Sequence, residues 1–171
     1  MSSPSWRAQL KAALNRLRRA ESTPRITILG IGNDLRGDDA AGVRIVRQLS
    51  ARIAEKEQPG LLLLEAGIAP ENFSGPLRKF SPHLVLLVDA ARMGLQPGEI
   101  RWLDWRDTGG ISSSTHTLPP SVLAQYLVNE LGCAVYLLGI QPETMDFDEP
   151  VTPAVGAAIN AVAEELAKNL S

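Results

Sequence analysis

Five apolar segments recur along the chain, separated by amphipathic stretches. Four are continuous runs rich in Val, Ile and Leu and bounded by Gly, Pro, Asn or Asp, a pattern typical of buried strands. These are "RITILG" at 25–30, "LLLLEAG" at 61–67, "LVLLVDA" at 84–90 and "AVYLLGI" at 134–140. The fifth, "EIRWLDW" at 99–105, alternates apolar and polar residues, which predicts a strand nearer an edge of the sheet.

Helical periodicity fills the intervals between these strands. It covers Asp38 to about Lys56, about Pro70 to Phe80, about Pro119 to Leu131 and about Thr152 to Leu170. Strands that alternate with helices predict a mainly parallel sheet with helices on both faces. We therefore expect one α/β domain over residues 25–171.

Residues 1–24 form a separate pattern, an amphipathic helical arm. Apolar residues at helical spacing define one face of the arm: Trp6, Leu10, Leu14 and Leu17. We expect Ser3 to cap the helix and Pro4 to occupy its first position. The opposite face is basic, which is typical of solvated surface.

Composition narrows the classes of function. The chain of 171 residues is 44% hydrophobic, enough for one domain with a substantial core. Its formal net charge is −2, and the 11 basic and 18 acidic residues that follow residue 25 give the body a net charge of −7. Nucleic acid is excluded as the main partner, because binding to phosphates requires a basic face.

Cysteine usage and hydropathy suggest where the protein works. Cys133 is the single cysteine, so no internal disulfide can form and no thiolate cluster can hold a metal. No stretch reaches the length of a membrane span, and the first residues lack the apolar core of a secretory signal. We expect a cytoplasmic protein.

The segment "GIGNDLRGDD" at 30–39 resembles a phosphate-binding loop but departs from it twice. The third glycine of a dinucleotide fingerprint is replaced by Leu35, and the next glycine is Gly37. Asp38 and Asp39 would lie in the first turn of the next helix, where two carboxylates repel phosphate and attract a cation. Both can instead cap that helix, and we expect Asp38 to do only this.

Two carboxylates converge on one edge of the predicted sheet, and a loop histidine is a candidate third ligand. Asp89 ends a buried strand, and the loop with Asp39 opens on the same edge, where ligands of open α/β sheets bind. His116 lies in the polar loop "GGISSSTHTLPPS" that leads into a helix. Two carboxylates and one imidazole suit a borderline or hard divalent metal, and three ligands leave room for substrate and water.

Other assignments of these residues remain open. A serine of the run 112–114 can act as nucleophile, with His116 as base and Asp89 as orienting acid, although no G-x-S-x-G elbow is present. Asp89 can also cap the turn after its strand. His83 precedes its strand at the opposite edge and is expected to be structural, and Cys133 is expected to be a buried thiol.

Five motifs in chain order resemble those of the [NiFe]-hydrogenase maturation endopeptidases. They are "GIGNDLRGDDAAG", "APEN", "LVDAARMGLQPGEI", "STHTLP" and "LGIQP". The segments "MGLQPGEI" and "GIQP" favour the subgroup that serves formate-hydrogenlyase-type and other energy-converting hydrogenases. The arm before Arg25 lies outside the resemblance, and Glu65-Ala66 replaces the Asp-Gly that relatives tend to carry.

The resemblance implies a fold and a set of site residues. The fold is a three-layer α/β/α sandwich with a five-stranded sheet whose fourth strand is antiparallel. Asp39, Asp89 and His116 correspond to the three metal-contacting positions. If 99–105 is the antiparallel strand, residues 105–115 must return His116 to the site, and eleven extended residues reach at most about 36 Å.

The resemblance also implies an activity. The protein is expected to be a nickel-dependent endopeptidase of aspartic type that cuts the C-terminal extension from a nickel-loaded hydrogenase large-subunit precursor. The nickel would arrive with the substrate, and Asp39 can serve as general base. The alternatives are a non-catalytic metal-binding module or chaperone that docks the same precursor, and a small-molecule hydrolase of similar fold. The sequence carries no signal for an oligomeric state.

Overall fold

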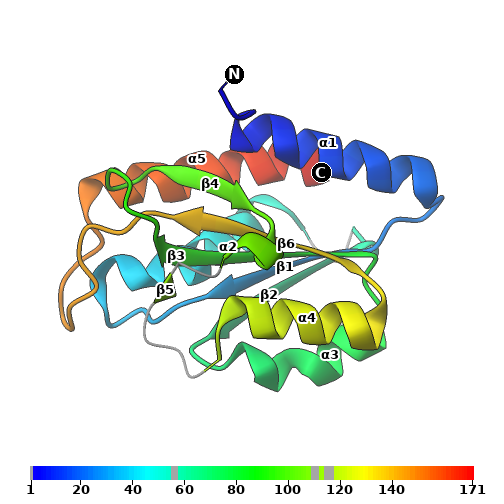
Figure 1. The fold of residues 1–171 in the computed structure, drawn as a ribbon. Helices are drawn as coiled ribbons and strands as arrows, with labels where there is room; N and C mark the ends of the chain where they lie inside the picture. The colour runs from blue at the N-terminus through cyan, green and yellow to red at the C-terminus, as the bar shows by residue number, and fades with distance from the viewer. Residues whose placement is uncertain (1, 55–57, 109–111, 114–117) are drawn as a thin grey trace.

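A sheet between two layers of helices forms the protein (Figure 1). The computed structural model describes residues 2–54, 58–108, 112–113 and 118–171. The strands are β1 (Ile26–Ile31), β2 (Leu61–Gly67), β3 (Leu84–Arg92), β4 (Ile100–Leu103), β5 (Ser112–Ser113) and β6 (Ala134–Ile140). The helices are α1 (Trp6–Ala20), α2 (Ala41–Arg52), α3 (Ser74–Phe80), α4 (Pro120–Leu131) and α5 (Pro153–Leu170). Short 3₁₀ turns span Gly37–Ala40, Pro70–Phe73 and Trp105–Asp107.

The sheet has the strand order β2-β1-β3-β6-β4, and the two-residue strand β5 pairs separately with β3. β1, β2, β3 and β6 run parallel, whereas β4 is antiparallel to β6 and forms one edge. The predicted three-layer α/β/α fold with one antiparallel strand is therefore confirmed, as is the edge position of the segment at 99–105.

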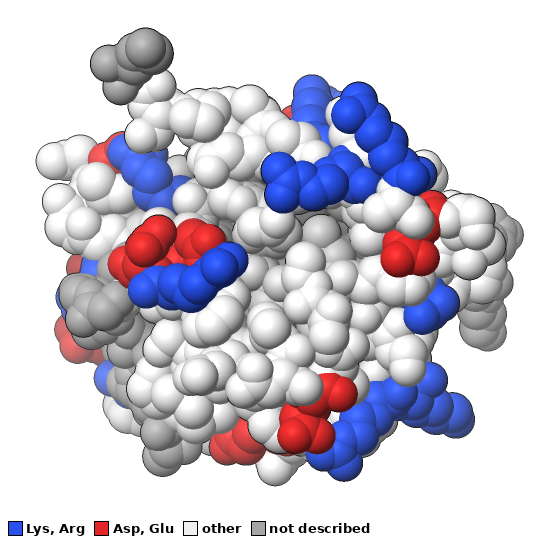
Figure 2. Space-filling model, turned by 45° about the vertical axis from the view of Figure 1, so that its right-hand side comes forward, with Lys and Arg blue, Asp and Glu red and all other residues white. Residues whose placement is uncertain are grey.

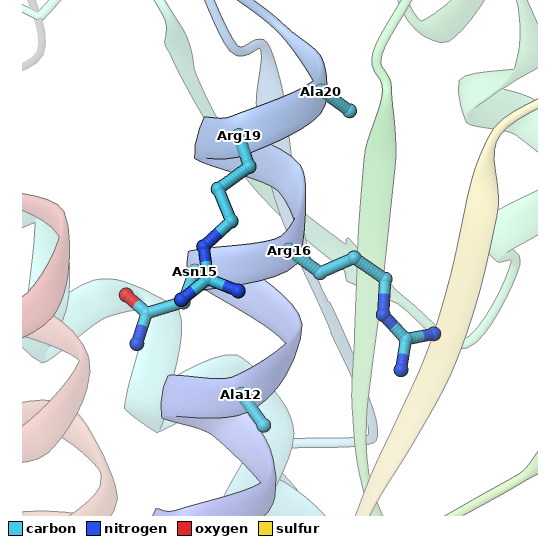
Figure 3. A pocket seen from close by; sticks show the side chains of 5 residues that line it. All are labelled: Ala12, Asn15, Arg16, Arg19 and Ala20. Atoms are coloured by element: carbon cyan, nitrogen blue, oxygen red, sulfur yellow. The ribbon is translucent and has the colours of Figure 1, made fainter.

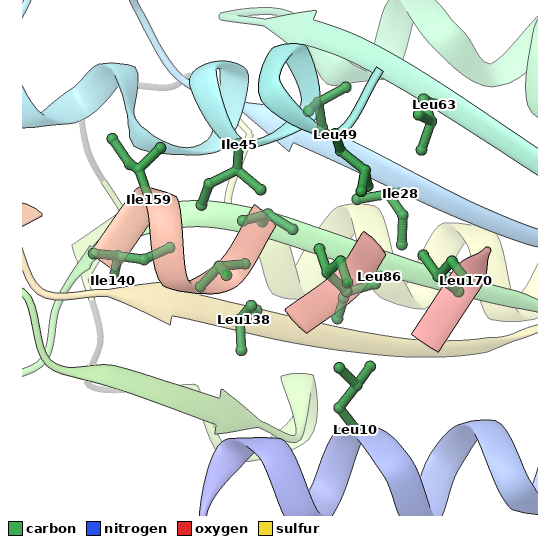
Figure 4. Packing of buried hydrophobic residues seen from close by; sticks show 14 of the residues in the cluster. Leu10, Ile28, Ile45, Leu49, Leu63, Leu86, Leu138, Ile140, Ile159 and Leu170 are labelled. Carbon is green, nitrogen blue, oxygen red and sulfur yellow. The ribbon is translucent and has the colours of Figure 1, made fainter. Parts of the chain in front are cut away.

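Successive residues of the central strands face opposite layers, as the pleat of a strand requires. Ile28, Leu86 and Leu138 belong to one buried cluster (Figure 4), which includes residues of α1, α2 and α5. Leu29, Leu87 and Leu137 belong to the other, which includes residues of α3 and α4. Both faces of these strands are covered, which explains why their sequences are continuous apolar runs.

Helix α1 packs on the same face of the sheet as α2 and α5 (Figure 1). All four apolar residues of the predicted face are buried: Trp6, Leu10, Leu14 and Leu17. The predicted cap is wrong, because the helix begins at Trp6 and the hydroxyl of Ser5 accepts a hydrogen bond from the Ala8 N–H at 3.2 Å. An N-cap at Ser5 satisfies a free donor of the first turn.

Helix α2 is shorter than its sequence pattern predicts. It begins at Ala41, after the 3₁₀ turn, and ends at Arg52. Ile53 adopts an extended backbone while its side chain stays buried, so the apolar periodicity continues beyond the end of the helix.

No helix among the described residues is long and apolar enough to cross a membrane.

Candidate functional site at the β1/β3 edge

The candidate site lies where β1 and β3 separate. In the sheet, β1 lies between β2 and β3. After β1 the chain passes through α2 and enters β2 on one side, whereas β3, on the other side, belongs to the second half of the sheet. Ligands of open α/β sheets bind at such a switch point, beyond the carboxyl ends of the strands. Pairing between the two strands ends at Gly30 and Val88. Asp89 follows Val88 directly, and Asp39 lies in the turn Gly37–Ala40 after β1.

Asp39 is held in a tight loop that follows β1. The Asn33 N–H donates to the Asp39 carbonyl at 3.2 Å, and the Asp39 N–H donates to the Arg36 carbonyl at 2.9 Å. Gly32 has a φ of 146°, and a Cβ at this position would lie 1.9 Å from the Asp39 carbonyl oxygen. The glycine-rich sequence therefore permits a close approach of two backbone segments, and Asp39 is fully buried.

Asp89 lies inside β3 rather than at its end. The strand continues to Arg92, and Asp89 is in register with Gly139 of β6. The predicted strand end is wrong because β5 pairs with Ala91 and Arg92 and extends β3 beyond the point where β1 leaves it. The side chain is 1% exposed. Among the described residues, neither carboxylate oxygen accepts a regular hydrogen bond.

The two carboxylates influence each other electrostatically. Burial raises the pKa of Asp89 well above its usual value, and the nearby charge of Asp39 raises it further, while the Ala90 N–H opposes the shift. Two buried acids that repel each other favour a proton or a cation between them. This is the arrangement expected of a cation site or of an acid–base pair.

Asp38 has a structural role that differs from the predicted helix cap. One carboxylate oxygen accepts hydrogen bonds from the Glu143 N–H at 2.8 Å and the Thr144 N–H at 3.2 Å. The other accepts from the Thr152 N–H at 2.7 Å and the Thr152 hydroxyl at 3.0 Å. Asp38 thus fastens the segment 143–152 to the turn that carries Asp39, and its side chain caps neither the 3₁₀ turn nor α2.

The third predicted ligand, His116, lies outside the described residues, as does Ser114. The backbone before them is placed: Ser113 pairs with Ala91 and Ser112 with Arg92 in the antiparallel β3–β5 ladder. The chain after β4 therefore returns to the end of β3 that carries Asp89, as the predicted crossing requires. Among the described residues, no group of three or more His, Cys, Asp and Glu side chains could hold a metal ion.

His83 and Cys133 have the structural roles predicted for them. His83 Nδ1 accepts a hydrogen bond from the Arg25 N–H at 3.0 Å, at the amino ends of β1 and β3. Its Nε2 lies 3.6 Å from a carboxylate oxygen of Glu21. Burial raises the pKa of the Cys133 thiol, which disfavours the reactive thiolate.

Two residues near the candidate site make contacts that the sequence did not predict. The buried side chain of Gln141 accepts hydrogen bonds from the N–H groups of Met93 at 2.7 Å and Leu95 at 3.2 Å, which fixes the loop after β3. Arg47 pairs with Asp34 at 2.8 Å and with Glu65 at 2.9 Å. The motif "LGIQP" carried the signal for Gln141, whereas only the fold brings Arg47 to Glu65.

A basic hollow lies on α1 and is unrelated to the paired carboxylates. It is lined by Ala12, Asn15, Arg16, Arg19 and Ala20 (Figure 3). Figure 2 brings forward the side with the C-terminal end of α1, where Lys and Arg side chains form separate groups. In the described part of the chain, neither Arg16 nor Arg19 forms an ion pair. This hollow offers charge but no acid–base chemistry.

Comparisons with known proteins agree on one family. A model of the family described as hydrogenase maturation protease matches residues 43–169. A putative hydrogenase maturation protease of Methanocaldococcus jannaschii is 34% identical, over 77% of this chain and 80% of its own. The hydrogenase 3 maturation protease of Escherichia coli K12 is also 34% identical, over 81% and 86% of the two chains.

Solved structures show the same likeness. The crystal structure of a [NiFe] hydrogenase maturation protease from Thermococcus kodakarensis superposes with a TM-score of 0.80 and 34% identity. It covers 92% of this chain and 98% of its own. The crystal structure of the hydrogenase 3 maturation protease has a TM-score of 0.68 and 33% identity, over 84% of this chain.

Proposed function

The chain belongs to the hydrogenase maturation protease family, and from this premise we propose that it removes the C-terminal extension of a nickel-loaded hydrogenase large-subunit precursor. The observation that carries the proposal is the pair of buried carboxylates, Asp39 and Asp89, at the β1/β3 switch point. Burial raises the pKa of Asp89, and the nearby charge of Asp39 raises it further, which supports this pairing.

We treat nickel as part of the substrate. The donor set fits it: two carboxylates, with His116 as the predicted third ligand, give the oxygen and nitrogen atoms that borderline divalent metals accept. A cation between Asp39 and Asp89 would also relieve their repulsion. Bound in this way, nickel supplies Lewis acidity toward the scissile carbonyl or an attacking water.

Residues of this chain hold the two carboxylates in position for the proposed reaction. The loop closed by Asn33 and Arg36 fixes Asp39, which is the proposed general base and a metal ligand. Asp89 contributes a second carboxylate from inside a strand, where its position varies little. Ser113 lies three residues before His116 and pairs with β3, which supports the assignment of His116 to this site.

An incomplete site suits the selection of loaded substrate. Three ligands, two of them on loops and one on a strand, bind a metal less tightly than a closed structural site does. The substrate's own nickel ligands would complete the coordination shell, so binding energy becomes available only when loaded precursor is present. Discrimination against unloaded precursor then follows from the missing ion.

The test is a processing assay with candidate large-subunit precursors in matched nickel-loaded and nickel-free forms. Mass spectrometry of the loaded precursor should show a new C-terminus, and the nickel-free form should stay intact. Equal cleavage of both forms would contradict nickel dependence. Binding without any new C-terminus would favour the alternative of a non-catalytic module or chaperone.

A further inference from the structure

Two apolar side chains beside the candidate site are largely open to solvent. Leu35 is 64% exposed and Phe147 is 63% exposed, the highest values among the large apolar residues that the structure describes. Leu35 lies in the loop after β1, and Phe147 lies in the loop between β6 and α5. Exposed apolar side chains that lie together on a rigid surface mark an interaction site more often than scattered ones do.

Backbone hydrogen bonds hold these two loops side by side, as Figure 1 shows at the left end of the sheet. The Asp148 N–H donates to the Leu35 carbonyl at 2.9 Å, and the Gly37 N–H donates to the Glu149 carbonyl at 3.1 Å. The Asp38 N–H donates to the Thr144 carbonyl at 2.9 Å, which adds to the bonds of the Asp38 side chain. Leu35 and Phe147 therefore belong to one preorganised surface.

Acidic side chains surround this apolar pair. The segment 143–149 carries four exposed carboxylates: Glu143, Asp146, Asp148 and Glu149. Within the part of the chain that the structure describes, none of the four forms an ion pair. One basic group belongs to this surface, because the Arg36 guanidinium lies 4.7 Å from the centre of the Phe147 ring. Four carboxylates against this one guanidinium leave the surface negative, with an apolar centre.

The loop that carries Asp39 joins this surface to the candidate site. Leu35 and Arg36 lie inside the loop that hydrogen bonds close onto Asp39. A polypeptide that presents a bond to Asp39 and Asp89 would therefore have neighbouring residues within reach of Leu35 and Phe147. These substrate residues are expected to be basic, because like charges that face each other across an interface are costly.

We propose that Leu35, Phe147 and the carboxylates of 143–149 form a docking surface for a basic segment of the protein substrate that carries at least one large apolar side chain. The inference rests on the proposed function and adds a substrate-recognition surface to it. Anionic lipid and nucleic acid are repelled by the same carboxylates. The competing occupant is a second copy of this chain, presenting Arg16 and Arg19 of the basic hollow.

The test measures steady-state cleavage of nickel-loaded precursor by Phe147→Ser and Asp146→Lys. Each variant has a matched control: Val122→Ser changes an apolar residue that is 47% exposed on α4, and Glu164→Lys reverses an exposed charge on α5. We expect KM to rise at least about tenfold in the two docking variants with kcat within about twofold, as loss of uniform binding requires. The controls should keep the wild-type KM.

Precursor binding to the Asp39→Asn protein, which keeps an oxygen atom at the metal position but removes the proposed base, alone and combined with Phe147→Ser, gives a readout that does not depend on cleavage. Unchanged KM and binding in the docking variants would overturn the docking surface and leave the proposed function intact. If the chain with Asp39 intact binds the precursor through Phe147 but yields no product, the proposed function is overturned and the docking surface is left intact. Self-association of the wild type in sedimentation, abolished by Asp146→Lys, would assign the surface to a second copy and also overturn the inference.

Discussion

The negative charge of Asp39 raises the pKa of Asp89, although Asp39 lies in the turn after β1, Asp89 lies inside β3, and the two residues are far apart in the sequence. Burial is the larger cause of the shift, and the proximity of Asp39 adds to it. In the protein without substrate, Asp89 therefore binds its proton more tightly than it does in the unfolded chain.

This relationship predicts how stability depends on pH. A group whose folded pKa is raised contributes stability that is fully present below its ordinary value of 3.8 and is lost as pH rises through the folded pKa. Asp89→Asn removes this titration. Urea unfolding between about pH 4 and about pH 8 should show the wild type losing stability relative to Asp89→Asn as pH rises. If the stability of the two proteins changed equally with pH, the raised pKa of Asp89 would be contradicted.

Gly32→Ala should damage the site through the backbone. A Cβ at Gly32 would lie 1.9 Å from the Asp39 carbonyl oxygen, so the loop must move. We expect processing to fall at least about a hundredfold, as for a small misplacement of a catalytic group. Gly156→Ala is the matched control, because its Cβ would meet nothing within 4 Å. Normal processing by Gly32→Ala would show that the loop tolerates the shift.

Asp38→Asn should destabilise the fold. The carboxylate accepts backbone N–H bonds on both oxygens, and an amide turns one acceptor into a donor that faces donors. We expect a loss of about 2–4 kcal/mol in the free energy of unfolding. Thr152→Val removes only the hydroxyl contact and should cost about 1 kcal/mol. Equal effects in chemical denaturation would show that the backbone bonds to Asp38 contribute little.

Helix α1 should contribute to global stability, although it lies outside the motifs. Leu14 is 1% exposed and belongs to the same apolar cluster as the sheet. Leu14→Ala should cost about 2–5 kcal/mol in the free energy of unfolding. Arg16→Ala on the solvent face should change it by no more than about 0.5 kcal/mol. If Leu14→Ala left the free energy of unfolding unchanged, the arm would fold separately from the domain.

The sequence predicted the central strands β1, β3 and β6 because both of their faces are buried, so each is a plain apolar run. It predicted that Asp39 and Asp89 converge, and the structure brings them close enough for the charge of Asp39 to affect the pKa of Asp89. It misassigned Asp38, whose hydrogen-bond donors in 143–152 lie more than a hundred residues away in the chain. The end of β3 was misjudged for the same reason, since β5 extends it from a distant loop.

Replacing each proposed site residue in turn tests which side chains processing requires. Asp39→Ala, Asp89→Ala and His116→Ala should each lower processing of nickel-loaded precursor to the background rate, because the loss of one ligand leaves too few groups to fix the metal beside the scissile bond. His83→Ala is the control, since His83 contacts Arg25 and Glu21 at the opposite edge. Circular dichroism and thermal unfolding must show that each variant is folded. Wild-type turnover by folded His116→Ala would remove the histidine from the site, whereas inactive His83→Ala would show that processing depends on the amino edge of the sheet as well.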